Sequence, residues 1–306
     1  MKILLIDAYN FIYRGMVSFG KPKEHKLCID HSFCTTTEDH CICNSPWDSE
    51  NNLCYGDNYL VVYNFFRNLR PIIEKFTPDK CFFALEGHPK FRYDLYPEYK
   101  ANRLIKLGSE LKINPKQDSK DRFNKAKDLI IDLLQFLPIT QVIAKDYEAD
   151  DLIGSLCNLH KDDEVTVITS DSDYIQLLQR KYKNFVLYDA KTKENIIPPE
   201  YPYIAWKCLD GDTSDNIPRL MSKAKALKTI NDPVLFKKFL ELPENLSNFN
   251  LNRDLIEFRD ISNEQIDYLE GTKDFNLLKE QFDGMKFVSL TADKYWKKFV
   301  DIFDKL

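Results

Sequence analysis

Short apolar runs alternate with amphipathic segments over the first two thirds of the chain. Residues 2–6 and 80–85 are apolar runs of the length of buried strands, and the apolar side chains at 62–73 keep the spacing of one helix face. The alternation continues with strand-like runs at 141–144, 164–169 and 184–188 and with helix-like segments at 126–137, 148–160 and 172–180. This series predicts an α/β fold with a largely parallel central sheet and helices on both faces.

The pattern changes after about residue 198, where the strand-like runs stop. Helical spacing continues instead at 201–209, 222–230, 234–242, 251–259 and 263–271. We therefore expect an α/β domain at 1–198 and a helical region at 199–306. Two segments fit neither pattern: 21–58 is an insertion rich in Cys and His, and about 100–123 is basic and poor in apolar residues.

The composition is that of a globular protein and excludes a disordered chain. Of 306 residues, 43% are hydrophobic and 30% are charged, so the chain can bury a core. It contains no apolar run of the ~18–20 residues that cross a bilayer, and Asp7 ends the first apolar run too early for a signal peptide. We therefore expect a cytoplasmic protein with no membrane partner, and eight Cys residues that are free thiols or metal ligands.

The charge is unevenly distributed along the chain. The net charge of −5 and the pI of about 5.7 argue against a uniformly basic nucleic-acid binder. Between residues 90 and 127, however, there are eleven Lys and Arg and only five acids, and between 216 and 231 four basic residues occur without an acid. Both stretches are candidates for contact with nucleic acid.

Carboxylates follow the ends of the predicted strands. Because ligands of an open parallel sheet bind beyond the carboxyl ends of its strands, these positions are the first candidates for a site. One acid there can serve as a helix cap, but two or three acids at several strand ends exceed what capping needs. The candidates are Asp7, Glu86, Glu148, Asp150, Asp151, Asp171 and Asp173, joined by Asp212 and Asp215 at the start of the helical region.

Such a group of acids predicts a divalent metal site. Carboxylates in one crevice repel one another unless cations neutralise them. Oxygen ligands without clustered His suit Mg²⁺ or Mn²⁺ better than Zn²⁺. Two such ions about 4 Å apart stabilise the attacking and leaving oxygens of a phosphodiester. We therefore expect two Mg²⁺ or Mn²⁺ ions and phosphodiester hydrolysis.

Five motifs occur in one order over roughly residues 1–260. They are Leu4-Leu5-Ile6-Asp7, the segment from Phe91-Arg92 to Tyr99-Lys100-Ala101-Asn102-Arg103, EADDLIG at 148–154, TSDSD at 169–173 and DGDTSDNIP at 210–218. In this order they resemble the 5′-nuclease superfamily, which comprises the 5′→3′ exonuclease domain of bacterial DNA polymerase I, the bacteriophage 5′-exonucleases and the flap endonucleases. The resemblance implies a PIN-like sheet, a helical arch at about 100–123 and a helix-hairpin-helix-like module at about 210–230.

The resemblance also implies a role for each matching residue. The first metal or its bridging waters would be held by Asp7, Glu148, Asp150, Asp171 and Asp173, and the second by Asp151, Asp212 and Asp215, directly or through water. Lys100 and Arg103 would lie at the base of the arch with Arg92 near them and contact the scissile phosphate, where fixed cations offset the charge on the phosphoryl oxygens. A solvated basic helix face is the alternative for Lys100 and Arg103.

The chain departs from the family pattern at three places. Leu85 stands where the family has Asp, so Glu86 is expected to supply that carboxylate one residue later. The hairpin after Pro218 lacks the family's Gly residues, so duplex DNA is expected to contact the side chains of Arg219, Lys223, Lys225 and Lys228, with the family's monovalent cation, K⁺, as a further expectation. In the insertion, a structural Zn²⁺ within 25–54 and a loop with free thiols are the alternatives.

The resemblance implies a structure-specific 5′-nuclease that hydrolyses phosphodiesters near 5′ ends or flap junctions of DNA, and of RNA primers, by a two-metal mechanism. Its substrates would be branched, nicked or 5′-flapped duplexes and RNA–DNA primer ends. We expect a monomer of bacteriophage type that acts in DNA replication or repair in the host cytoplasm, with a single-strand-binding protein, a clamp or a polymerase as partner. The alternatives are a non-catalytic DNA-junction-binding relative and a PIN-type ribonuclease, which shares the acidic sheet edge.

Overall fold

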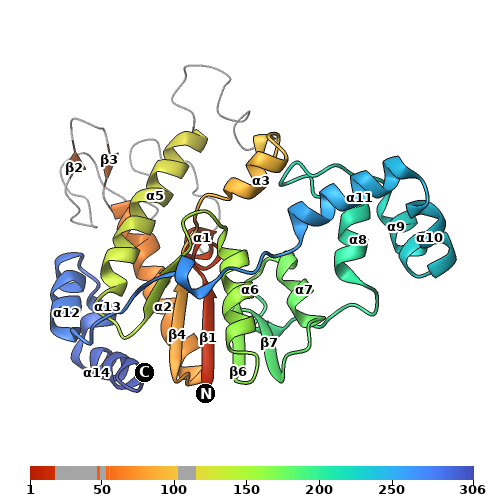
Figure 1. Cartoon of the computed structure of the whole chain (residues 1–306). Helices are drawn as coiled ribbons and strands as arrows, with labels where there is room; N and C mark the ends of the chain where they lie inside the picture. Colours follow the sequence, from red (N-terminus) through yellow and green to blue (C-terminus); the bar gives the residue numbers. More distant parts are fainter. Residues whose placement is uncertain (18–46, 49–52, 55, 103–114) are drawn as a thin grey trace. The chain divides into compact units, whose positions relative to one another are not determined.

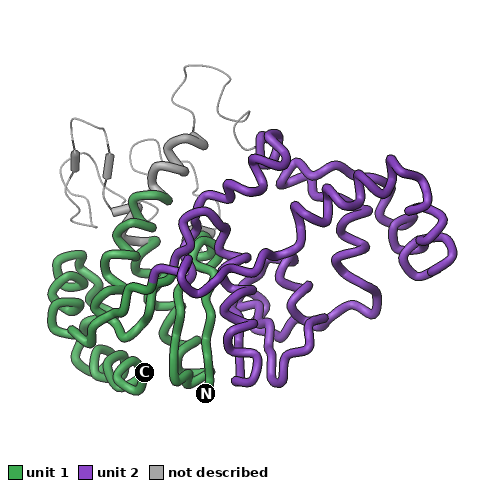
Figure 2. The backbone as a smooth tube through the Cα atoms, viewed as in Figure 1, with its two compact units in different colours: residues 1–83, 113–142, 268–306 green, residues 84–112, 143–267 purple. Residues whose placement is uncertain are grey.

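The structure is a computed structural model that describes residues 1–17, 47–48, 53–54, 56–102 and 115–306, with side chains described at 1–14, 61–102 and 123–306. The chain forms two compact units (Figure 2). Unit 1 comprises residues 1–83, 113–142 and 268–306, and unit 2 comprises residues 84–112 and 143–267. The two units do not divide at residue 198, because the last helices of the chain belong to unit 1. The expected functional division at that residue stays a prediction.

Unit 1 contributes four described strands to the central sheet, in the order β1-β4-β5-β9; Figure 1 labels β1 and β4. They are β1 (Lys2–Asp7), β4 (Lys80–Ala84), β5 (Thr140–Ile143) and β9 (Asp267–Leu269). The helices of this unit are α1 (Ala8–Val17), α2 (Gly56–Phe76), α5 (Pro115–Leu134), α12 (Phe275–Gly284), α13 (Val288–Thr291) and α14 (Asp293–Phe303). Helix α2 packs against α1, α5 and α14, so the C-terminal helices complete the unit that begins with β1.

Aromatic side chains fill the core of unit 1. Phe65 and Phe66 of α2 are fully buried, and their rings meet edge to face with centroids 5.1 Å apart. Phe66 also meets Phe282 of α12 at 4.8 Å, and Phe282 lies 6.1 Å from Phe299 of α14. Full burial of one such ring stabilises the fold by roughly 1.5–3 kcal/mol. The cluster therefore joins α2 to the C-terminal helices.

Two predictions concern segments of unit 1 that lie mostly outside the described residues. In the insertion, only the short strands β2 (Trp47–Asp48) and β3 (Leu53–Cys54) are described, and they pair antiparallel with Trp47 opposite Cys54. The zinc prediction depends on side chains outside the described residues. Of the predicted arch at about 100–123, residues 103–114 also lie outside the described residues. Residues from Pro115 onward belong to helix α5.

Unit 2 contains the parallel pair β6 (Glu164–Ile168) and β7 (Asn184–Asp189), with β8 (Glu194–Asn195) antiparallel to β7. Its helices are α3 (Lys90–Leu95), α6 (Ala149–Leu159), α7 (Ile175–Leu178), α8 (Tyr203–Asp210), α9 (Lys223–Ile230), α10 (Pro233–Leu240) and α11 (Pro243–Ile256), with 3-10 turns η2 (Ser172–Tyr174) and η3 (Asn263–Gln265). The predicted α/β fold, a mostly parallel sheet with helices on both sides, is confirmed. No helix in the described part of the chain is both long and apolar enough to span a bilayer.

Helices α8 to α11 pack around a second apolar core in unit 2. Helix α8 contacts α9 and α11, and α10 contacts the same two helices. Trp206 and Leu209 of α8 lie in this core. Helix α10 begins where Asp232 caps it, since the Asp232 Oδ1 accepts hydrogen bonds from the backbone N of Val234 (3.0 Å) and Leu235 (3.1 Å). Pro233 at the first helical position needs no hydrogen-bond acceptor.

The prediction of a helix at 263–271 is wrong. The structure has the turn η3 at Asn263–Gln265 followed by strand β9 at Asp267–Leu269. Close packing explains the difference, because a Cβ on Gly271 would lie 1.8 Å from the carbonyl oxygen of Leu137. Thr140 of β5 also donates a hydrogen bond to the side chain of Glu270 (2.7 Å). Contacts with distant segments therefore override the local helical pattern.

Candidate metal centre

Unit 2 contains eight of the nine predicted metal ligands, from four segments far apart in sequence. Glu86 follows β4, three acids open α6, two follow β6 at η2, and two lie in the loop after α8; beyond Glu86 they are Glu148, Asp150, Asp151, Asp171, Asp173, Asp212 and Asp215. The ninth, Asp7, ends β1 in unit 1, where its Oδ1 accepts a hydrogen bond from the backbone N of Asn10 (3.1 Å).

The N-terminus of α6 gathers three carboxylates. Oxygen atoms of Glu148, Asp150 and Asp151 lie within 4.8 Å of one another. Glu86 reaches the same helix end, because its Oε2 accepts a hydrogen bond from the backbone N of Ala149 (3.1 Å). Unpaired N–H groups at a helix N-terminus favour negative charge. Glu86 therefore lies beside the predicted ligands, as a replacement for the family's Asp would have to.

Asp151 is fully buried in an ion pair with Arg92. The Arg92 guanidinium donates two hydrogen bonds to the Asp151 carboxylate, one of them at 2.8 Å, and its Nε donates to the carbonyl oxygen of Leu255 (2.8 Å). The backbone N of Arg259 also donates to Asp151 (2.8 Å). This pair joins α3, α6 and the end of α11. This arrangement differs from the phosphate contact expected for Arg92, since the residue is only 2% exposed and its guanidinium donors are engaged.

Lys100 projects its ammonium group into the carboxylates. Its Nζ donates to Glu148 Oε1 and lies 3.7 Å from Asp215 Oδ2. Tyr99 joins the same two acids, because its hydroxyl donates to Glu148 Oε2 (2.8 Å) and lies 3.2 Å from Asp215 Oδ2. Burial and the charges of Glu148 and Asp215 raise the pKa of the Tyr99 hydroxyl, so it stays a donor. Arg103, predicted beside Lys100, lies outside the described residues.

The segment that carries Lys100 is docked on the loop that carries Asp215. The backbone N of Lys100 donates to the Asp215 carbonyl (2.9 Å), and Lys100 has a left-handed φ of 57°. Asn102 Nδ2 donates to Asn216 Oδ1 (3.0 Å), and Asn216 Nδ2 donates to the Glu98 carbonyl (2.8 Å). A left-handed Lys is strained and persists only where its surroundings hold it. These contacts explain how two distant sequence motifs form one site.

Lys207 is a site residue that the sequence analysis missed. Its Nζ donates to Asp173 Oδ1 (2.7 Å) and Asp212 Oδ2 (2.6 Å). Asp212 is also held by Ser214, whose backbone N (2.7 Å) and Oγ (2.6 Å) donate to Oδ1. The pKa of Lys207 is raised, because the two carboxylates outweigh the effect of burial. A signal was present in the sequence, since Lys207 is the one charged residue in the stretch 201–209 that precedes the acidic motif.

Burial raises the pKa of several of these carboxyl groups. Burial, followed by the charge of Asp173, raises the pKa of Asp171 to about 6. Burial, with the charges of Asp151 and Glu148, raises the pKa of Asp150 well above its ordinary value. At Asp212, burial is outweighed by hydrogen bonds from Lys207 and Ser214, which lower the pKa. A cation bound next to Asp171 and Asp150 would stabilise their ionised forms.

The chemistry of the donor set fits Mg²⁺ or Mn²⁺. Among the described residues, the group that can hold an ion consists of carboxylates alone, at Glu148, Asp150 and Asp151. Hard oxygen donors of this kind suit both ions. The cysteines whose side chains are described are all buried thiols and belong to no such group; they are Cys81, Cys157 and Cys208.

The loop after α8 leads from the acids to a basic helix. Gly211 has φ 71°, and a Cβ there would lie 2.6 Å from the Pro218 carbonyl oxygen, so the loop needs Gly. Asn252 of α11 closes the loop, since its Nδ2 donates to the carbonyls of Cys208 (2.8 Å) and Pro218 (2.7 Å). The predicted DNA-binding side chains on this loop and on α9 are all exposed; they are Arg219, Lys223, Lys225 and Lys228.

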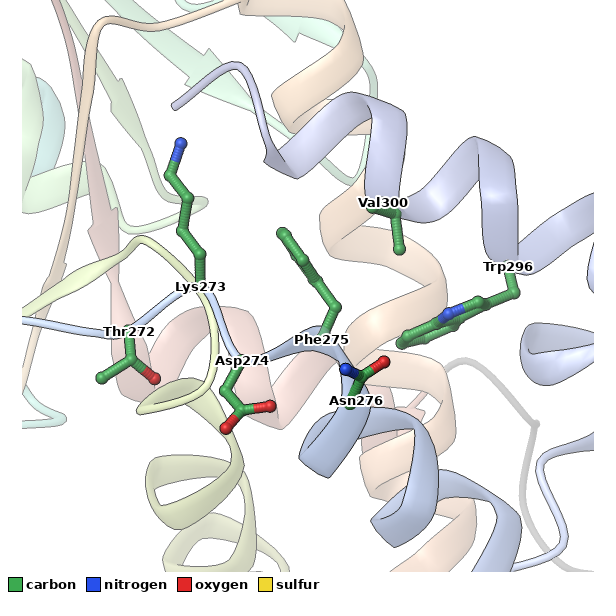
Figure 3. A pocket seen from close by; sticks show the side chains of 7 residues that line it. All are labelled: Thr272, Lys273, Asp274, Phe275, Asn276, Trp296 and Val300. Atoms are coloured by element: carbon green, nitrogen blue, oxygen red, sulfur yellow. The ribbon is translucent and has the colours of Figure 1, made fainter.

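Unit 1 has a hollow whose lining differs from the acidic centre of unit 2. Its volume is about 520 Å³, and Trp296 and Val300 of α14 point toward it together with Phe275 of α12 (Figure 3). Its one carboxylate, Asp274, caps α12 by accepting a hydrogen bond from the backbone N of Leu277 (3.0 Å). The hollow therefore has no group of acids that could hold a divalent ion.

Fold and site together define the class: an α/β domain with an acidic centre suited to divalent metal and phosphodiester chemistry. The family model for the N-terminal resolvase-like domain of 5′-3′ exonucleases matches residues 2–201, and the chain belongs to this family. The 5′-3′ exonuclease of Bacillus subtilis (strain 168) is 28% identical over 223 residues, which cover 64% of this chain and 71% of that one. DNA polymerase I of Streptococcus pneumoniae serotype 4 is 26% identical over 212 residues, covering 61% of this chain and 23% of the polymerase.

Solved structures show the same fold. The bacteriophage T5 flap endonuclease, in a complex with DNA and metal ions, matches with a TM-score of 0.57 and 15% identity over 100% of this chain and 99% of that one. Human GEN1 in complex with Holliday junction DNA matches with a TM-score of 0.50 and 14% identity over 99% of this chain and 72% of that one. At this identity the likeness establishes the architecture alone.

Proposed function

We propose that this chain is a structure-specific 5′-nuclease that hydrolyses phosphodiesters near 5′ ends or flap junctions of DNA with Mg²⁺ or Mn²⁺. Membership of the 5′-3′ exonuclease family supports the proposal, as does the likeness to a flap endonuclease solved with DNA and metal ions. The observation that carries it is the placement of Lys100 among the carboxylates, where its ammonium contacts Glu148 and lies 3.7 Å from Asp215. Phosphoryl transfer needs acids that hold metal and a fixed cation beside them.

The residues of the site divide this work. When bound, divalent ions would polarise the phosphodiester and activate water. In unit 2 the ions would be held by Glu86, Glu148, Asp150, Asp171, Asp173, Asp212 and Asp215. Asp7 of unit 1 stays a ligand predicted from the sequence. Lys100 supplies a fixed positive charge for the phosphoryl oxygens, and Tyr99 orients the Glu148 carboxylate. The Arg92–Asp151 pair fixes the start of α6 and so the position of Glu148 and Asp150.

The substrate contacts follow from the exposed basic side chains. Arg219, Lys223, Lys225 and Lys228 would bind the phosphates of the duplex beside the cleaved strand. Side-chain contacts of this kind release counterions, so binding should weaken steeply with salt. The substrates would be branched, nicked or 5′-flapped duplexes, including RNA–DNA primer ends. Because this chain matches part of DNA polymerase I, a polymerase is the protein partner we propose first.

A cleavage assay tests the proposal. The substrate is a 5′-flap duplex labelled at both ends of the flap strand, incubated with Mg²⁺ or with EDTA. Wild type should release a flap-length product only with Mg²⁺, and Asp171→Asn should be slower by about 100-fold or more, because a charged ligand is lost. Asp162→Asn is the matched control, since Asp162 is exposed at the opposite end of β6 and should not change the rate.

Four outcomes would contradict the proposal. Cleavage in EDTA, or equal rates for wild type and Asp171→Asn, would exclude metal-dependent chemistry at this site. Salt-sensitive binding by wild type without cleavage would favour the non-catalytic junction-binding alternative. Cleavage of an all-RNA strand alone would favour a PIN-type ribonuclease.

A further inference from the structure

Lys207 is a buried cation that the proposed reaction does not use. It belongs to α8, is 8% exposed, and bridges Asp173 from η2 and Asp212 from the loop after α8. Both acids are proposed metal ligands. Burying an ammonium group costs free energy unless its partners repay that cost. A lysine placed between two proposed ligands therefore calls for a specific role.

The groups around Lys207 are held in place. Its neighbour Cys208 is fully buried, and Asn252 donates a hydrogen bond to the Cys208 carbonyl (2.8 Å), so the backbone at this position cannot shift easily. The Asp212 carboxylate is oriented by two hydrogen bonds from Ser214 to its Oδ1, which turn Oδ2 toward Lys207. The site thus presents two carboxylate oxygens and one ammonium group in a fixed arrangement.

Direct contact with DNA fits Lys207 poorly. Its side chain is 10% exposed, close to the 13% of Lys100 and far below the 55% of Arg219 on the proposed DNA-binding loop. Lys207 differs from Lys100 because it donates hydrogen bonds to two proposed ligands, whereas Lys100 donates one to Glu148. A phosphate would also have to displace two charge-assisted hydrogen bonds before it met the ammonium group. The geometry favours a role toward the two acids themselves.

We propose that Lys207 is a built-in counter-cation that holds Asp173 and Asp212 together while no divalent ion is bound there and competes with that ion for the same oxygens. The inference rests on the proposed function. An ammonium group at 2.6 and 2.7 Å occupies oxygen lone pairs that Mg²⁺ needs at about 2.0–2.1 Å. An ion that binds these two oxygens therefore competes with the hydrogen bonds of Lys207.

Lys100 competes in the same way for Glu148, but its ammonium group donates a hydrogen bond to Glu148 and not to Asp150. We therefore expect two classes of ion: a weaker one at Asp173 and Asp212, where Lys207 bonds to both acids, and a tighter one at Glu148 and Asp150.

Removing the charge of Lys207 tests this inference on the full chain without DNA. Lys207→Met keeps the side-chain length and removes the ammonium group. Lys207→Gln keeps a hydrogen-bond donor without charge, and it is the variant to use if Lys207→Met does not fold. Lys90→Met is the matched control, because Lys90 pairs with Asp94 on the surface of α3. Titration calorimetry with Mn²⁺ gives stoichiometry and affinity, and melting temperatures are measured in EDTA and in Mn²⁺.

We expect Lys207→Met to melt at least about 2–4 °C below wild type in EDTA, because two neighbouring carboxylates lose their cation. Adding Mn²⁺ should raise the melting temperature of Lys207→Met by more than it raises that of wild type. The weaker class of Mn²⁺ should bind the variant about tenfold more tightly or better, since it no longer displaces a cation. Lys90→Met should match wild type in every measurement.

The outcomes separate this inference from the proposed function. Equal Mn²⁺ affinity and stoichiometry for wild type and both Lys207 variants would overturn the inference, and flap cleavage by the same wild-type preparation would leave the function standing. If wild type binds no Mn²⁺, both are overturned. If the variants lose affinity for flap DNA in Ca²⁺ while Mn²⁺ binding is unchanged, Lys207 is a phosphate contact and the inference is wrong.

Discussion

The two sides of the acidic centre in unit 2 are neutralised by different cations. At the start of α6, the Asp151 carboxylate receives two hydrogen bonds from the buried guanidinium of Arg92. Around η2, Asp173 and Asp212 share the ammonium group of Lys207. A guanidinium matches a carboxylate through a rigid planar fork, whereas an ammonium group is a compact charge on a flexible stem. The Arg92–Asp151 pair is therefore suited to permanent structure, whereas the ammonium group of Lys207 is suited to exchange for another cation, as is that of Lys100 at Glu148.

The largest effect that would test this comparison is expected from Arg92→Met. Removal of the guanidinium leaves Asp151 charged and fully buried, which should cost about 3–5 kcal/mol of unfolding free energy. Urea denaturation followed by circular dichroism measures the change. Lys90→Met breaks an exposed pair and should have no measurable effect. If Arg92→Met lost less unfolding free energy than Lys207→Met does in EDTA, Lys207 and not Arg92 would be the structural cation of the centre.

A smaller effect is expected from Tyr99→Phe, which removes the hydroxyl between Glu148 and Asp215. The variant loses a buried hydrogen bond to a charged group and should be destabilised by about 1–3 kcal/mol. Flap cleavage should slow through kcat more than through KM, because Glu148 is less well oriented. Tyr96→Phe is the control, since the Tyr96 hydroxyl bonds to exposed Glu98 (3.1 Å). Equal kinetics for both variants would exclude an orienting role for Tyr99.

The smallest effect expected is a pH dependence of the metal-free protein. Burial raises the pKa of Asp171 to about 6 from the ordinary 3.8, so between these values the folded chain binds more protons than the unfolded chain. The Asp171 contribution therefore makes stability fall as pH rises through this window. Melting temperatures in EDTA should show a steeper fall for wild type than for Asp171→Asn, and Mg²⁺ should flatten it for wild type. If melting temperature depended on pH identically in wild type and Asp171→Asn, Asp171 would not be a buried carboxyl of the acidic centre.

The sequence predicted the type of fold and the segments that carry the acids. Strand-like and helix-like periods depend on neighbouring residues, and the acids stand directly after apolar runs, so both signals are local. The helix expected at 263–271 failed because contacts of Gly271 and Glu270 with residues 137–140 decide that segment. The sequence did not predict the burial of Arg92, because its partners Asp151 and Leu255 are distant in sequence.

By itself, the sequence determined that this chain folds as an α/β protein with carboxylates at its strand ends and basic residues in two separate stretches. Only the tertiary structure decided which charges meet. It paired Arg92 with Asp151, brought Lys100 to Glu148 by docking one motif on another, and placed Lys207 between Asp173 and Asp212. The physical reason is that apolar periodicity is read along the chain, whereas a charge in a low-dielectric interior is balanced by whatever group folding brings within a few ångströms.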